Sequence, residues 1–97
     1  MHLSDQEARL SRLAEMLMGE GKLEEAAATY QKLLALNPNL PDAWYNLGYL
    51  ERCQRHFPES IDAYRAALAR HVTHPEEVHL NIAAILSEHM DRIPDAE

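Results

Sequence analysis

The sequence repeats an apolar pattern with a period of 34 residues. Leu13 and Leu47 occupy the same place in two successive copies, and so do Tyr30 and Tyr64. A fixed period of this size indicates a supersecondary unit that stacks on its neighbours to bury an apolar face. Stacked units form an extended surface rather than one catalytic cleft. The aligned pairs are Leu10 with Trp44, Leu13 with Leu47, Ala14 with Gly48, Leu23 with Phe57, Ala26 with Ser60, Tyr30 with Tyr64 and Leu34 with Leu68.

The repeated unit is helical. The chain holds only two Val, four Ile and two Thr, which disfavours strands. The sequence Ser4-Asp5-Gln6-Glu7 has the form of a capping box, and proline or glycine stands at the later boundaries. Apolar spacing predicts helices over residues 5–18, 22–36, 41–55 and 58–69, and a fifth from residue 75 with Val78, Ile82, Ile85, Leu86 and Met90 on one side. Short turns make successive helices antiparallel.

The charge excludes some classes of partner. Sixteen acidic and nine basic side chains give a net charge of −7. Phosphate backbones repel such a chain, so neither nucleic acid nor an anionic membrane is expected as a partner. No segment approaches the roughly 20 apolar residues of a membrane span. A single cysteine, Cys53, excludes an internal disulfide, and we expect a cytoplasmic location.

These residues resemble the tetratricopeptide repeat, whose pattern is W-x2-L-G-x2-Y, then A-x3-F, then P. The second copy has Trp44, Leu47 and Gly48, and then Ser60 and Tyr64. The first copy reads Leu10-x2-Leu13-Ala14-x2-Leu17, then Ala26-x3-Tyr30, then Pro38. The resemblance implies an all-α, right-handed α-solenoid of two complete antiparallel helix pairs plus a fifth helix. We expect residues 1–97 to be one domain, with repeats at about 7–40 and 41–75 and a partial third at about 76–97.

The sequence also departs from the pattern. Glu51 replaces the final tyrosine of the first motif, Arg55 stands where a turn glycine is usual, and Val72 replaces the closing proline. Asn46-Leu47-Gly48 aligns with Asn81-Ile82-Ala83 at a spacing of 35, which places one extra residue in the connector 71–74. Residues 93–96 resemble the start of another second helix. We therefore expect a fragment of a longer bacterial repeat protein.

The resemblance implies a protein-interaction scaffold. In the family, the first helix of each repeat lines a concave groove that holds a peptide or partner helix. Tyr45 and Tyr49 are one turn apart, and tyrosine is a frequent interface anchor. The alternative interpretation is that the asparagines cap neighbouring turns and that Tyr45 lies partly in the core. Transferred residue by residue, the groove residues are Arg12, Glu15, Tyr45, Asn46, Tyr49, Arg52, Asn81, Ala84 and Glu88.

Chemical sites are not expected. His71, His74 and His79 lack the spacing of a metal site, and His71 is better explained by a helix C-terminus. Ser11 and Glu15 stand where some family members grip a ligand's terminal carboxylate with lysine and asparagine, and Glu15 would repel that ligand. Nothing in the sequence supports a nucleophile and base, so we predict no enzyme activity and no cofactor.

Two further expectations complete the sequence interpretation. The order of repeats is similar to the N-terminal repeats of bacterial proteins that end in a sulfotransferase domain. The alternative function is therefore an accessory domain that recruits substrate for such a transferase.

On the fifth helix, the stripe Ile82, Ile85, Leu86 and Met90 is expected to be only partly covered. Such a stripe predicts a weak homodimer through this helix, opposed by the acids of residues 75–97.

Overall fold

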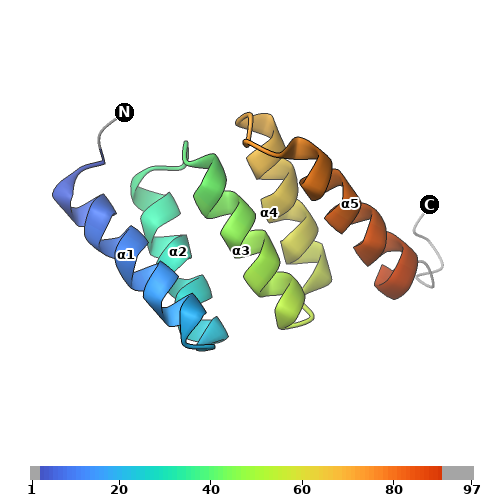
Figure 1. The fold of residues 1–97 in the computed structure, drawn as a ribbon, viewed down its shortest axis with the longest axis horizontal. Coiled ribbons are helices and arrows are strands. Elements are labelled where there is room, and N and C mark those ends of the chain that lie inside the picture. The colour runs from blue at the N-terminus through green and yellow to red at the C-terminus, as the bar shows by residue number, and fades with distance from the viewer. Residues whose placement is uncertain (1–2, 91–97) are drawn as a thin grey trace.

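The structure, a computed structural model, describes residues 3–90, which form helices joined by short connectors (Figure 1). No strand occurs among these residues. A π-helical turn, Leu86–Met90, continues the last helix. The predicted all-α fold with five helices is therefore confirmed. The helices are α1 (Asp5–Gly19), α2 (Leu23–Leu36), α3 (Pro41–Cys53), α4 (Phe57–Ala69) and α5 (Pro75–Ile85).

The helix ends follow from local sequence. The Ser4 hydroxyl accepts the Glu7 amide at 3.1 Å and the Glu7 carboxylate accepts the Ser4 amide at 3.4 Å, which confirms the capping box. Proline begins α3 and α5 and lies in the first turn of α4, where its missing amide costs nothing. Gly21, in the connector between α1 and α2, has a left-handed backbone with φ 79°. Arg55 occupies the equivalent place between α3 and α4 and has φ 66°. The second repeat therefore keeps the left-handed conformation with a residue other than glycine.

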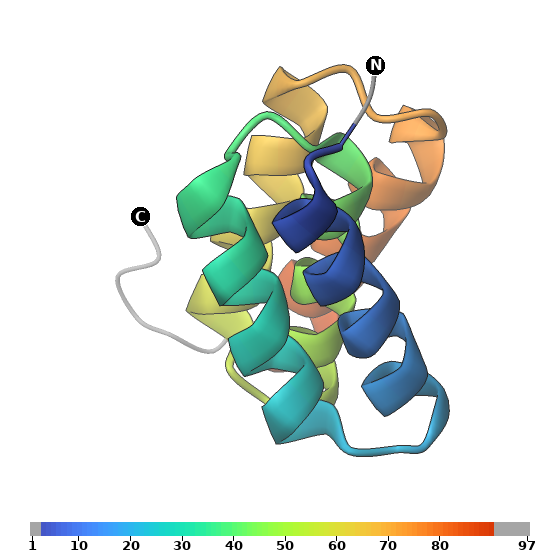
Figure 2. The same cartoon turned by 90° about the vertical axis from the view of Figure 1, so that its left-hand side faces the viewer.

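The helices form two layers. One layer contains α1, α3 and α5, and the other contains α2 and α4 (Figures 1 and 2). We call the side formed by α1, α3 and α5 the front face and the side formed by α2 and α4 the back face. The right-handed sense of the stack and the repeat boundaries at about 7–40, 41–75 and 76–97 stay predictions.

Small residues let α3 and α4 approach closely. A Cβ added to Gly48 would lie 2.8 Å from Cδ1 of the Tyr64 ring, closer than carbon atoms pack. The buried Ser60 hydroxyl donates to the Gly48 carbonyl oxygen at 2.7 Å. Bulky residues then fill the space beside these contacts, since Tyr30 and Tyr64 are both fully buried.

The exposure of Leu13 differs from the sequence prediction. Leu13 was expected in the core, but it is 40% exposed, whereas its equivalent Leu47 is only 6% exposed. The same holds one turn later for Met16, which is exposed, and Leu50, which is buried. Leu47 and Leu50 lie in the interior of the stack and belong to the core that α1 and α2 share with α3. Among the described residues, no helix precedes α1 to cover Leu13 and Met16 in the same way.

The predicted stripe on α5 also needs correction. Ile85 is fully buried and Ile82 packs against the core of α4 and α5, so neither is an open apolar residue. Leu86 is exposed as expected, and Leu80, which the stripe did not include, is 70% exposed. The side chain of Met90 lies outside the described residues. Leu80 on α5 and Leu86 in the π-helical turn are therefore the exposed large apolar side chains of this part of the chain.

Candidate functional site

The predicted groove residues come from the three helices of the front face. Two lie on α1, four on α3, two on α5, and Glu88 lies in the π-helical turn. Tyr49 is the large apolar side chain most open to solvent among them, at 46% exposure, and Tyr45 is half-buried. In order along the chain they are Arg12, Glu15, Tyr45, Asn46, Tyr49, Arg52, Asn81, Ala84 and Glu88.

Tyr45 and Tyr49, the two tyrosines of the predicted groove, differ in how much of each side chain packs in the core. The Tyr45 and Tyr64 rings are tilted against each other with centroids 5.6 Å apart, so Tyr45 is part of the packing between α3 and α4. Burial raises the pKa of Tyr64 far above its ordinary value. A hydrogen bond with Cys53 raises the pKa of Tyr49. Both phenols therefore stay neutral at physiological pH, and Tyr49 is the one that presents its ring to solvent.

The two asparagines have partners within the chain. Asn46 Nδ2 donates to the Tyr30 hydroxyl at 2.9 Å and so joins α3 to α2. Asn81 Oδ1 accepts a hydrogen bond from Arg52 Nη1, and Asn81 Nδ2 donates to the Glu77 carbonyl oxygen at 2.8 Å. Polar contacts within the chain thus stabilise the front face. These contacts use only some of the hydrogen-bonding groups of each asparagine.

Charge on this face is mixed. Arg52 Nη2 lies 4.0 Å from a Glu88 carboxylate oxygen, and both groups are partly open to water. An exposed pair of this kind contributes little to stability. Arg12 and Glu15 lie exposed on α1. The face therefore presents both signs of charge around the exposed Tyr49.

A hollow of about 190 Å³ separates α1 from α3 on this side. Glu15 and Asn46 line it, together with Asp42 and Ser11, which we did not predict as contacts. Asp42 lies four residues before Asn46 and therefore one turn away on the same side of α3. Helical spacing from Asn46 is the signal that identifies it.

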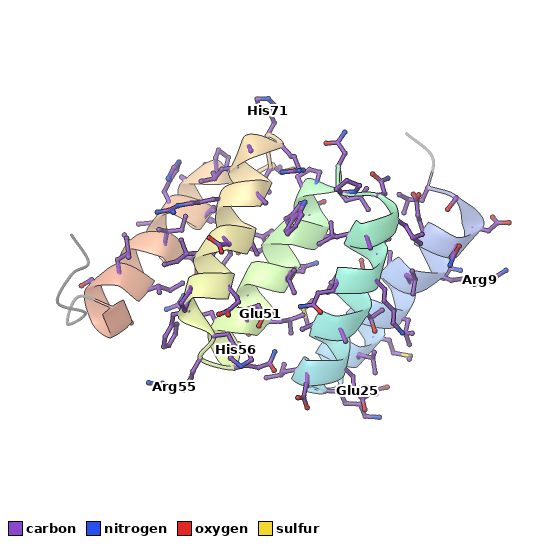
Figure 3. All side chains as sticks on the ribbon, turned by 180° about the vertical axis from the view of Figure 1, so that it is seen from behind. Arg9, Glu25, Glu51, Arg55, His56 and His71 are labelled. Carbon is purple, nitrogen blue, oxygen red and sulfur yellow. The ribbon has the colours of Figure 1, made fainter. Side chains whose placement is uncertain are left out.

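The back face carries a second feature that the sequence interpretation did not assign. Glu51 was noted only as a departure from the repeat pattern. In the structure it is a buried carboxylate, 6% exposed, that accepts from Gln31 Nε2 at 3.3 Å and lies 2.7 Å from His56 Nδ1. Glu51 and His56 lie together between α2 and α4 (Figure 3).

Comparison with known families finds one match within the chain. The family model of the TPR repeat matches residues 14–51, from the middle of α1 through α2 to Glu51 in α3. Residues 14–51 therefore carry a tetratricopeptide repeat. No curated protein is similar enough to the chain to count as a match. Tetratricopeptide repeats act in general as scaffolds for protein–protein interaction.

The described residues offer neither a metal site nor a membrane-spanning helix. Within residues 3–90, no three His, Cys, Asp or Glu side chains gather where they would hold a metal ion. None of the described helices is long and apolar enough to cross a membrane.

Proposed function

We propose that the front face binds a peptide or a partner helix, with Tyr49 as its central contact. The exposed Tyr49 ring carries this proposal. A tyrosine left open on a helix supplies a large apolar contact at low cost in side-chain entropy, and tyrosines of this kind often dominate binding energy. Arg52 lies one turn from it and adds a charged contact of the kind enriched at interfaces.

The remaining groove residues fit supporting roles. Asn46 and Asn81 retain amide or carbonyl groups that can pair with the backbone of an extended ligand. Glu15 and Arg12 on α1, and Ala84 and Glu88 at the far end, lie at the two sides of the α3 contacts. Internal hydrogen bonds already hold Asn46 and Asn81, so less conformational entropy is lost when a ligand binds. Recruitment of substrate to an attached transferase would use the same face, and rests on the sequence alone.

The test compares Tyr49→Ala with Leu36→Ala. Leu36 lies on α2, away from the front face, and is exposed to a similar extent as Tyr49. Immobilised wild-type and variant proteins are used to capture partners from the source lysate, with circular dichroism to check helicity. We expect Tyr49→Ala to lose a partner that wild type and Leu36→Ala both retain. Identical capture by all three proteins contradicts the proposal.

A further inference from the structure

A groove runs along the back face between α2 and α4, with α3 as its floor (Figure 3). Two adjoining hollows of about 510 Å³ and 310 Å³ make up this groove, and both are lined by Gln31, Glu51 and Glu59. The larger hollow extends to Pro38 at one end, and the smaller extends to His56 at the other. We call this continuous space the back groove. It lies on the side opposite the face proposed above.

The back groove exists partly because of the residue at position 51. The repeat pattern has tyrosine there, and the first repeat has Leu17 at the equivalent place. A carboxylate is smaller than a phenol ring, so Glu51 leaves space between the two helices that a ring would fill. Burying a carboxylate costs free energy unless polar partners compensate it. Gln31 and His56 supply such partners at 3.3 Å and 2.7 Å, and they hold the carboxylate in the groove.

The walls of the back groove combine apolar surface with negative charge. Leu34, Ala35 and Trp44 line the larger hollow, and Ala27 and Ala28 line the smaller. No lysine or arginine is among the residues that line either hollow. Four acidic residues are among them: Glu24, Glu51, Glu59 and Asp62. The chemistry that complements this lining is aliphatic with positive charge.

A cation lies beside the Pro38 end of the groove, although it is not part of the lining. Arg70 Nε donates to the Pro38 carbonyl oxygen at 2.6 Å, and its guanidinium lies 5.4 Å from the centre of the Trp44 ring. Trp44 Nε1 donates to the same carbonyl at 2.7 Å. A positive group on a ligand is therefore disfavoured at the Pro38 end. It is favoured toward Glu51 and Glu59, where the two hollows meet.

We propose that the back groove is a second docking site, and that it takes a partner-protein segment in which lysine or arginine is flanked by aliphatic residues. The aliphatic side chains cover Ala28, Ala35 and Trp44, and the cation pairs with Glu51. A charge-assisted hydrogen bond in such a partly buried place is stronger than one between neutral groups. The front and back faces would then engage different ligands at the same time.

The experiment uses two defined probes. One is a capped 12-residue peptide of leucine, alanine and lysine, and the other has glutamate in place of every lysine. Trp44 is the single tryptophan of the chain and lines the groove, so its fluorescence reports occupancy directly. Amide chemical shifts in nuclear magnetic resonance spectra then locate the bound peptide. We expect the lysine peptide to bind and to shift residues of α2 and α4, and the glutamate peptide not to bind.

Matched variants separate a specific contact from general attraction to an acidic protein. Glu51→Gln should weaken the lysine peptide about tenfold, because a charged contact becomes a neutral one. Glu76→Gln removes the same charge from the exposed start of α5 and should leave affinity nearly unchanged. Glu51→Tyr restores the pattern residue, fills the groove and should abolish binding while helicity is kept. This variant decides the question if Glu51→Gln does not fold.

Three outcomes overturn the proposal: equal weakening by Glu51→Gln and Glu76→Gln, equal binding of the two peptides, or shifts confined to α1, α3 and α5. The last outcome would place the peptide on the front face. Conversely, binding in the back groove that survives Tyr49→Ala shows that this site is independent of the one proposed above. The two proposals can therefore fail separately.

Discussion

Two equivalent tyrosines should respond oppositely to loss of their hydroxyl groups. Tyr30 and Tyr64 occupy the same place in successive repeats, and both are buried. The Tyr30 hydroxyl accepts a hydrogen bond from Asn46, whereas the Tyr64 hydroxyl is buried without a hydrogen-bond partner among the described residues. Asn81, the equivalent of Asn46, is held by Arg52 and by the Glu77 carbonyl instead. The same residue type therefore has its hydroxyl satisfied in one repeat interface and not in the next.

The expected magnitudes follow from these contacts. A hydrogen bond of the Tyr30 type contributes about 1 kcal/mol, so Tyr30→Phe should lower the free energy of unfolding by about that amount. Burying a hydroxyl without a partner costs about 1–3 kcal/mol, so Tyr64→Phe should be neutral or should stabilise the fold by about 1 kcal/mol. The two variants should then differ by about 1–2 kcal/mol in the free energy of unfolding. For a domain of this size that corresponds to roughly 5–10 °C in Tm.

Thermal and urea unfolding followed by circular dichroism measures this difference, since both substitutions keep the ring. A third variant tests the cause. Arg52→Ala removes the donor that holds Asn81 Oδ1 and leaves the asparagine only its exposed hydrogen bond to the Glu77 carbonyl oxygen, which Asn81 Nδ2 can exchange for one to the Tyr64 hydroxyl. In that background Tyr64→Phe should become destabilising. An equal loss of stability in Tyr30→Phe and Tyr64→Phe would refute the reasoning.

Two further predictions test the packing and the free surface. Gly48→Leu should lower stability by about 1–3 kcal/mol, because even its Cβ would clash with the buried Tyr64 ring; an unchanged Tm would show that α3 and α4 do not pack this closely. Weak dimerisation through α5 should strengthen with salt, because salt screens the repulsion between the acidic side chains of the two copies. Leu80→Gln should abolish the dimer, because Leu80 is the most exposed apolar side chain of this helix. Sedimentation equilibrium that finds a monomer at every salt and protein concentration would exclude the dimer.

The sequence alone determined the helices and their order. The capping box at Ser4, the prolines that open α3 and α5 and the left-handed turn at Gly21 act over a few residues, so their effects can be predicted without the rest of the fold. The period of 34 also aligns Gly48 with Ala14, and a small residue that recurs in this way favours the close helix contact that the structure has at Gly48. These features depend on local backbone chemistry and on repetition.

The environment of each side chain was decided by the tertiary structure. Leu13 and Leu47 have the same local pattern, yet only Leu47 is buried, because burial depends on which helices lie on both sides. Tyr30 and Tyr64 differ because Asn46 donates to the Tyr30 hydroxyl, whereas Asn81 is held by Arg52 and by the Glu77 carbonyl oxygen. The back groove at Glu51 likewise needs α2 and α4 to stand on either side of α3. Periodicity specifies which residues are equivalent, but contacts between helices decide what each one touches.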